Sequence, residues 1–189
     1  MSDFLTIDTT AGLTYQEKVD PLSIYGETHP MLFKVIPEYT TPLPNQPMNT
    51  LVKRMKGAIG KYAGIGLSAN QCGVFERVFL IGSDEFQLVC INPKVIEAST
   101  EIETAEEGCL SFPGLFLKIP RPKWIIAEFL DENGQTQQIK LDGVTARCYL
   151  HELDHMNGIR FVDYMKPLAL RMARKRQSKI IKTVKRRKK

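Results

Sequence analysis

The stretch HELDH at residues 151–155 constrains the fold and the chemistry of this chain more than any other. His151 and His155 stand four positions apart, and positions i and i+4 share one face of an α-helix. Two imidazoles on one helical face can bind a single metal ion. Glu152 lies about 100° around the helix from His151, where it can reach a water on the ion without binding the ion itself. The motif therefore predicts a helix with two metal ligands and a general base.

A chance match to HExxH is the alternative, in which the two histidines are ordinary helix residues beside an exposed glutamate. A catalytic metal site needs a third protein ligand, and zinc proteases with this motif take it from a residue further along the chain. After His155 this chain has no histidine, and its only acid is Asp163. The third ligand is therefore expected elsewhere in the sequence.

Cys109, in the stretch EEGCLSFPG, is the best candidate for that ligand. Gly108 and the turn Pro113-Gly114 allow a close backbone approach, and a cysteine at such a bend can be presented as a thiolate. Two imidazoles and one thiolate leave a fourth tetrahedral position for water, which is typical of a catalytic site. For the other cysteines we expect small buried hydrophobic side chains: Cys72, Cys90 and Cys148.

The length of 189 residues suits one domain, and a composition of 43% hydrophobic and 25% charged residues is that of an ordinary globular protein. No segment of the sequence has the length of apolar residues that a bilayer requires. The four cysteines form no CxxC pair, and the first forty residues resemble neither a secretory signal nor an arginine-rich transit peptide. We therefore expect reduced thiols and a cytoplasmic location, and we take the chain to be a monomer.

Local patterns predict an irregular arm followed by a helix. The many prolines of the stretch 36–47 favour an extended conformation. The stretch 48–63 has an apolar stripe at helical spacing, and Asn49 is its predicted N-cap.

The remainder of the chain predicts strands and then the histidine helix. β-Branched runs follow in the middle of the chain, and the last two are joined by a hairpin turn at Asn133-Gly134. The histidine helix is expected from Gly143 to the terminating pair Asn157-Gly158. The predicted fold class is α+β, with short antiparallel sheets packed around the central HExxH helix.

The glycine-rich stretch GIGLSANQCG, residues 64–73, does not have the spacing of a phosphate-binding loop. A strand with few side chains and an exposed edge suits an extended peptide, because its backbone groups are free to pair. Gln71 is then an amide donor near the metal, or else an ordinary surface glutamine.

Together, GIGLSANQ, EGCLS and HELDH resemble, in this order, the three signature motifs of the peptide deformylases. INP at 91–93 and DGVTARC at 142–148 are similar to the same family, and the resemblance extends over residues 22–165. It implies a metal-dependent hydrolase that removes the formyl group from the N-terminal formylmethionine of nascent polypeptides and releases formate.

The resemblance also implies the composition of the metal site. Cys109, His151 and His155 would bind one divalent ion, Fe²⁺ by resemblance, with Zn²⁺ or Ni²⁺ as substitutes. Glu152 would be the general base and acid. Many members of the family have glutamine before the first histidine, where this chain has Leu150; this changes neither a ligand nor the base.

The substrate side of the site is implied in the same way. Gln71 and the backbone N–H of Leu110 would form the oxyanion pocket, and Glu107 would be a structural partner salt-bridged to Arg121. Ser68 stands where alanine is usual in the family, which exchanges one small residue for another. Three residues would pair with the backbone of the nascent peptide: Ile65, Gly66 and Gly108.

The last 24 residues form a basic tail. Residues 166–189 contain twelve lysines or arginines and no acid, so we divide the chain into a catalytic domain, 1–165, and this tail. Ala169, Ala173, Ile180 and Val184 form a rough helical stripe, which predicts a basic helix; a disordered, solubilising tail is the alternative. We expect it to dock on ribosomal RNA, because the expected substrate is a nascent chain and twelve cations gain affinity from phosphate neutralisation. In position and charge the tail also resembles the C-terminal helix with which some bacterial deformylases bind the ribosome.

Two other functions remain open from the sequence. A general zinc endopeptidase would share HExxH, but it should lack the cysteine of EGCLS and should cleave unformylated peptides. A nucleic-acid-binding protein would have structural histidines and would use the tail as its functional part. Formate release from formyl-Met-Ala-Ser separates the deformylase from the endopeptidase, and retention of RNA binding with no metal bound would favour the nucleic-acid-binding protein.

Overall fold

The computed structural model describes residues 20–83 and 86–187. Residues 1–19 of the predicted N-terminal arm and the last two residues of the tail lie outside the described residues. The α-helices are α1 (Gln46–Tyr62), α2 (Gly143–Met156) and α3 (Pro167–Arg187), and the short 3-10 helices are η1 (Pro30–Phe33), η2 (Ala69–Cys72) and η3 (Phe161–Tyr164). The strands are β1 (Gly66–Ser68), β2 (Val78–Ser83), β3 (Phe86–Ala98), β4 (Ile102–Gly108), β5 (Phe116–Pro122), β6 (Trp124–Leu130) and β7 (Thr136–Asp142).

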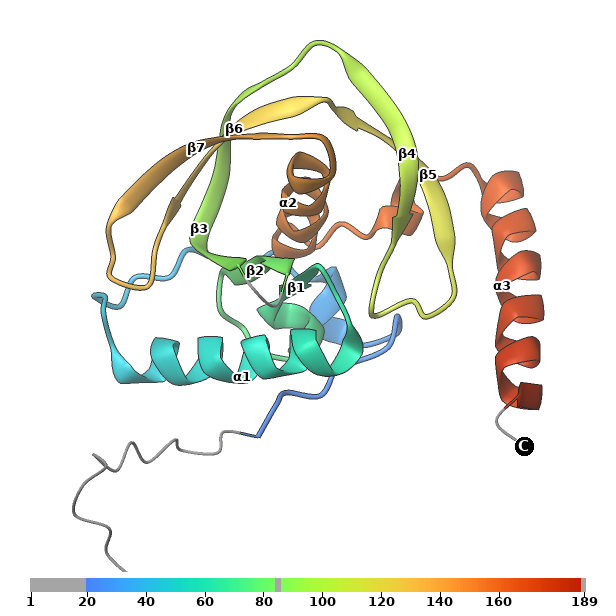
Figure 1. Cartoon of the computed structure of the whole chain (residues 1–189), viewed down its shortest axis with the longest axis horizontal. Helices are drawn as coiled ribbons and strands as arrows, with labels where there is room; N and C mark the ends of the chain where they lie inside the picture. Colours follow the sequence, from blue (N-terminus) through green and yellow to red (C-terminus); the bar gives the residue numbers. More distant parts are fainter. Residues whose placement is uncertain (1–19, 84–85, 188–189) are drawn as a thin grey trace, which may run out of the picture.

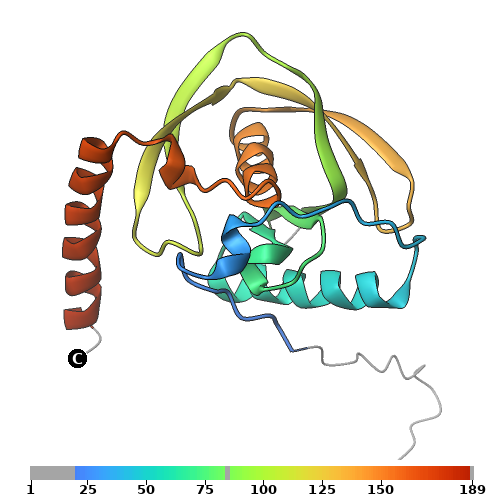
Figure 2. The ribbon, with the colours of Figure 1, turned by 180° about the vertical axis from the view of Figure 1, so that it is seen from behind.

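Two antiparallel sheets surround helix α2 (Figure 1). The larger sheet has the order β1-β2-β3-β6-β7, and β4 pairs with β5 in a separate two-stranded sheet. Helix α1 runs across the base of the molecule, and α3 stands beside the β4–β5 sheet in both views (Figure 2). The predicted α+β class, with short antiparallel sheets around the histidine helix, is confirmed.

Helix α2 is fixed in place by a buried aromatic contact. The ring of Tyr149 packs edge to face on Phe79 of β2, with ring centroids 5.0 Å apart. Its hydroxyl donates to the carbonyl oxygen of Lys94 at 3.0 Å, beside a register shift in β3. Burial of a large aromatic side chain contributes about 1.5–3 kcal/mol, and the hydroxyl bond adds an orientation to that contact. The helix is therefore held by the sheet on one side, which leaves another side for the site.

The predicted beginning of α1 was wrong. The helix begins at Gln46, and its N-cap is Asn45, whose side-chain oxygen accepts from the Met48 N–H at 2.9 Å. Pro47 lies in the first turn, where backbone N–H groups have no acceptor within the helix. Its missing N–H therefore costs nothing there, and this proline is part of the helix instead of preceding it. The proline-rich stretch thus ends before residue 46, and Asn49 is an ordinary helical residue.

Strands β4 and β5 were not predicted from the sequence. Pro120 and Pro122 argue against a strand, but β5 pairs only with β4 among the described strands, so its prolines do not interrupt a central ladder. Leu117 and Ile119 alternate with exposed residues and fill a small core, which was the available signal. The sheet matters for function because its connecting loop carries Cys109.

Other local predictions are confirmed. The hairpin turn lies between β6 and β7, with Gly134 at a φ of +79°. Helix α2 begins at Gly143 and ends before Asn157, and Gly158 follows with a φ of +70°. Such positive φ values are accessible to glycine at little cost. This explains why Asn-Gly pairs form the hairpin turn and follow the end of α2.

The basic tail is helical from Pro167 to Arg187. Ala173 of the predicted stripe is buried, whereas Ile180 is half-exposed, and the side chain of Val184 lies outside the described residues. None of the helices in the described part of the chain is both long and apolar enough to cross a membrane.

Candidate metal centre and substrate pocket

The three predicted metal ligands lie together. One ligand atom each from Cys109, His151 and His155 falls within 4.8 Å of the others. The Sγ of Cys109 is 3.3 Å from Nε2 of His155, and the centroids of the two imidazole rings are 5.1 Å apart. The histidines come from one face of α2, and Cys109 comes from the loop after β4. Both histidines are buried, so their orientation is set by packing.

A buried carboxylate fixes the first histidine. Oε2 of Glu107 accepts from Nδ1 of His151 at 3.0 Å, which leaves Nε2 of that ring for a metal. Arg121 donates to both carboxylate oxygens, at 2.9 and 3.0 Å, so the predicted pair between Glu107 and Arg121 is present. Arg147 donates to Oε1 at 2.9 Å. Burial would raise the pKa of Glu107, but the bonds with His151 and Arg121 outweigh it and hold the pKa at about 2.

The two histidines of the cluster differ in their electrostatic environment. Burial disfavours a charged His151, but hydrogen bonds with Cys109 and Glu107 outweigh burial and raise its pKa to about 10. Burial lowers the pKa of His155 well below its ordinary value, so this ring is a neutral donor. One sulfur and two imidazole nitrogens within 4.8 Å of one another fit a divalent cation of the type that binds nitrogen and sulfur.

Glu152 lies beside the cluster, and its carboxyl group is buried. The residue is 4% exposed, and among the described residues no group hydrogen-bonds to its Oε2. Burial raises the pKa of its carboxyl to about 7. A Cβ on Gly66 would lie 2.6 Å from Glu152 Oε1 and 2.7 Å from the Sγ of Cys148, so only glycine fits there. The strand β1 thus approaches the carboxylate at backbone level.

Gln71 points its amide at the metal cluster. Its Nε2 lies 3.4 Å from the Sγ of Cys109 and donates to Ser111 Oγ at 3.2 Å. Its Oε1 accepts from the backbone N–H and the hydroxyl of Ser68, both at 3.0 Å, which determines which end of the amide faces the site. Ser68, which replaces the usual alanine, therefore orients Gln71. Leu110 follows Cys109 directly in the sequence, so its backbone amide lies next to the metal cluster.

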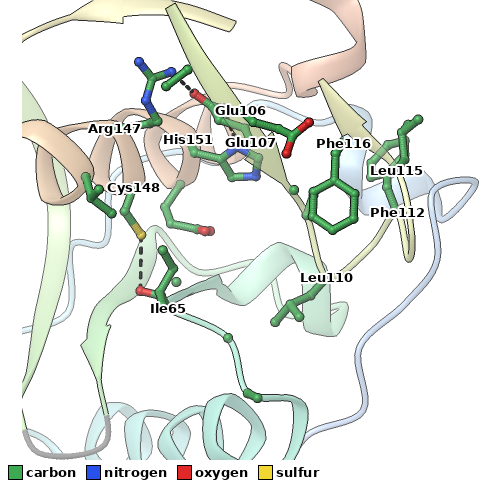
Figure 3. Close-up of a pocket in the computed structure, with 18 of the residues that line it drawn as sticks. Ile65, Glu106, Glu107, Leu110, Phe112, Leu115, Phe116, Arg147, Cys148 and His151 are labelled. Atoms are coloured by element: carbon green, nitrogen blue, oxygen red, sulfur yellow. Dashed lines mark hydrogen bonds and ion pairs between the residues drawn. The ribbon is translucent and has the colours of Figure 1, made fainter. Parts of the chain in front are cut away.

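A pocket of about 720 Å³ opens next to the cluster. Its walls are β1 with the residues before it, β4, the loop 109–115 and the start of α2. In Figure 3, Ile65 and Cys148 lie on one side of the hollow and Phe116 on the other. The lining is mainly apolar, with His151 and Glu152 at one end, so the pocket suits an apolar side chain next to the reacting bond.

The edge of β1 that faces away from β2 is free in the described structure. The amide of Gly82 donates to the carbonyl of Ile65 at 2.9 Å, so these two residues form a hydrogen-bonded pair. Pairs alternate along an antiparallel ladder, so the next pair, Gly66 and Ile81, is a non-hydrogen-bonded pair. The N–H and C=O of Gly66 therefore point to the free edge. The carbonyl of Ile65 already accepts from Gly82 and from the thiol of Cys148 at 3.2 Å.

Comparison with known proteins gives the family. The profile of the family described as polypeptide deformylase matches residues 21–171. The chain belongs to the peptide deformylase family. The reaction of this family is the removal of the formyl group from N-terminal formylmethionine, and the chain is an enzyme of this metal-dependent hydrolase family.

Individual deformylases show the extent of the similarity. The chain is 37% identical to the peptide deformylase of Thermotoga neapolitana over 139 residues, which are 74% of this chain and 85% of that one. It is 41% identical to that of Synechococcus sp. RCC307 over 124 residues, and there the match spans 62% of the relative's length and 63% of this chain. The crystal structure of a peptide deformylase from Legionella pneumophila superposes with a TM-score of 0.79 at 32% identity, covering 88% of this chain and 98% of that one.

Sequence reasoning missed three polar residues of this deformylase site. Arg147 stands one helical turn before His151, so the i, i+4 spacing could have placed it beside the metal ligand. The Oγ of Ser111 accepts a hydrogen bond from the amide of Gln71, and the carboxylate of Asp154 accepts one from Arg121 at 2.6 Å. Cys148 is buried as expected, but it also lines the pocket, and burial raises the pKa of its thiol well above the ordinary value.

Replacement of the central carboxylate tests its role in holding the site. In Glu107→Gln the guanidinium groups of Arg121 and Arg147 lose a buried negative partner, which should lower the free energy of unfolding by about 3 kcal/mol. The loss of the charged partner of His151 should weaken metal binding by about 10- to 100-fold. Urea denaturation and competition with a chelator measure the two effects.

Glu101→Gln is the matched control, because it removes an exposed glutamate paired with exposed Lys123. It should change the free energy of unfolding by less than about 1 kcal/mol and leave metal affinity unchanged. Equal effects of the two substitutions would contradict the special role of the buried carboxylate.

Proposed function

We propose that this chain hydrolyses the formyl group of N-formylmethionyl nascent peptides with Glu152 as the general base and acid, next to a metal ion held by Cys109, His151 and His155. The observation that carries the proposal is the approach of the three ligand atoms to within 4.8 Å, beside a buried glutamate at the end of an apolar pocket. Formate and a peptide that begins with methionine are the products.

The ion would be held by one sulfur and two imidazole nitrogens, and the pocket side of the cluster would remain open. This donor set suits Fe²⁺ and Zn²⁺, and we propose Fe²⁺ as the native metal, with Zn²⁺ or Ni²⁺ as substitutes. When bound, a divalent ion supplies Lewis acidity, which lowers the pKa of a water and polarises the formyl oxygen.

Glu152 moves the proton in both halves of the reaction. Its carboxylate takes a proton from the attacking water and returns it to the nitrogen that leaves the formyl carbon. The pKa of about 7 that burial gives this carboxyl suits both tasks, because a group near neutrality can accept and donate with similar ease. Since Oε2 has no partner among the described residues, no other group has to be displaced before it acts.

Gln71 and the backbone N–H of Leu110 stabilise the oxyanion that forms on the formyl oxygen. The Nε2 of Gln71 is held near Cys109 by the two bonds that its Oε1 accepts from Ser68. Such a fixed donor contributes about 3 kcal/mol to transition-state stability in comparable sites.

The peptide lies as an extended strand between β1 and β4. Gly66 offers its N–H and C=O at the free edge of β1, and Gly108 ends β4 on the opposite wall of the pocket. Ile65 contributes through its position next to Gly66, since its own carbonyl is engaged with Gly82 and Cys148. The methionine side chain fills the apolar pocket.

The variant Glu152→Ala tests the proposed mechanism. It should bind one equivalent of metal, like the wild type, because Glu152 is not a ligand. Its rate of formate release from formyl-Met-Ala-Ser should fall at least about 100-fold, because proton transfer loses its group. Metal analysis and a coupled formate assay give the two readouts.

Cys109→Ala is the companion variant, and it should lose the metal as well as the activity. Cleavage of unformylated peptides by the wild type would favour the endopeptidase, and full activity of Glu152→Ala would remove the proposed base.

A second proposal concerns the outer face of α3, which we propose docks on ribosomal RNA. This surface, which we call the basic face, consists of exposed cations: Arg171, Lys175, Arg176, Lys179, Lys182 and Arg186. Cations at this density gain affinity for phosphates through counterion release. Because the substrate is a nascent chain, such docking would bring the pocket to the polypeptide exit. We further propose that the enzyme acts as a cytoplasmic monomer.

Salt-dependent co-sedimentation with ribosomes tests the RNA proposal. Deletion of 166–189 should abolish binding, but it also removes Ala173 from a core cluster. A sharper variant replaces Lys175, Arg176, Lys179 and Lys182 by glutamine. Its binding should weaken and its slope of log K against log salt should fall by up to about 3, because four phosphate contacts are lost. Unchanged binding would end this proposal. RNA binding by a wild-type chain that holds no metal and releases no formate would instead favour the nucleic-acid-binding alternative.

A further inference from the structure

Helix α3 has an inner side as well as its basic face. The inner side packs against the β4–β5 sheet, and the helix stands beside that sheet in both views of the molecule (Figures 1 and 2). Ala173 is buried in one cluster with Phe112, Leu115 and Phe161. Phe112 and Leu115 also line the substrate pocket, so one layer of side chains separates the tail from the substrate.

The turn Pro113-Gly114 of the pocket wall contacts this helix directly. Gln177 donates from Nε2 to the carbonyl oxygen of Pro113 at 3.0 Å. A Cβ on Gly114 would lie 3.6 Å from Ile180 and 3.7 Å from Ile181, so the backbone of the turn rests against the helix. Gly114 has a φ of +73°, a conformation that glycine adopts without strain.

Arg174 holds Gln177 in the orientation that this bond requires. It donates to Oε1 of Gln177 at 2.9 Å, so the amide presents its NH₂ group to the turn. Arg174 also pairs with Glu27, and its guanidinium lies 5.7 Å from the ring centroid of Phe112. The side chains of Glu27, Arg174 and Gln177 thus form a chain of polar contacts that ends on the pocket wall.

The buried side chains of Phe112 and Leu115 anchor the loop 109–115 on both sides of the turn, but few backbone hydrogen bonds hold the turn itself. Its internal bonds run from the Phe112 amide to the Cys109 carbonyl at 2.9 Å and from the Leu115 amide to the Phe112 carbonyl at 3.1 Å. Pro113 has no N–H to donate, and its carbonyl faces α3 instead of the loop. Loss of the bond from Gln177 would therefore remove a polar restraint on the turn between Phe112 and Leu115, the two residues through which the loop lines the pocket.

We propose that α3 is a brace for the substrate pocket, and that Gln177 is a positioning residue that sets the affinity for the peptide through Pro113. This inference rests on the proposed function, because it concerns the same pocket. It also gives the tail a role in catalysis by a single free molecule, apart from any RNA that binds the basic face.

Gln177→Glu is the variant that breaks only the last contact. A glutamate has the same shape and still accepts from Arg174, but it cannot donate to the carbonyl of Pro113. The KM for formyl-Met-Ala-Ser should rise about two- to tenfold, the effect of one net hydrogen bond, whereas kcat and metal content should stay within about twofold. Ser178→Asp is the matched control, because it adds the same charge at the next, exposed position.

Three results would overturn the inference: an unchanged KM in Gln177→Glu, an equal rise of KM in Ser178→Asp, or a fall of kcat as large as the rise of KM. Failure of the proposed function looks different, because a metal-loaded wild type would then release no formate at all. Far-UV circular dichroism confirms that α3 remains helical in both variants before the kinetic comparison.

Discussion

The buried carboxylate of Glu107 is the interaction on which the geometry of the site depends. It lies on β4, and it binds a guanidinium from β5 and a guanidinium and an imidazole from α2. The two-stranded sheet and the histidine helix are joined through this group. A single carboxylate with this many partners has little freedom to move, because each partner would lose a buried hydrogen bond. Cys109 follows Glu107 by two residues, so the contacts of Glu107 also fix the position of Cys109 relative to the histidines.

The remaining polar groups of the pocket are fixed in a similar way. Ser68 orients the amide of Gln71, and Gly66 lets the backbone of β1 approach Glu152 to a distance that no side chain would allow. Donors and base are therefore held before a substrate arrives, which is how an enzyme lowers the cost of reorganisation during the reaction. The outer wall is less constrained than this inner part, and helix α3 lies where it can supply the missing restraint.

The sequence predicted those features of the site and fold that depend on residues close together along the chain. The i, i+4 spacing placed His151 and His155 on one face, and glycine with asparagine ended the hairpin and α2 where expected. The approach of Cys109 to these histidines is a long-range contact that spacing cannot supply; the order of three motifs pointed to it. The roles of these residues stay predictions.

What the sequence did not reveal depends on tertiary contacts. The prolines of β5 argued against a strand, but they are tolerated there because the sheet has only two strands. Pro47 belonged to a pattern typical of loops, although it lies in the first turn of α1. Arg147 was not singled out from the sequence, because the groups it binds come from β4 and β5, far away along the chain. The rough apolar stripe in the tail indicated a helix with an inner side, but the sequence could not show that this side packs on the wall of the pocket.

The central claim is that one sulfur and two imidazole nitrogens bind a single ion that is open to the pocket. X-ray absorption at the edge of the bound metal tests this most directly. The account predicts one sulfur at about 2.3 Å and two nitrogens at about 2.0–2.1 Å, with an oxygen completing the shell, as is typical for such donor sets. A spectrum without a sulfur neighbour, from a fully loaded and active enzyme, would contradict it.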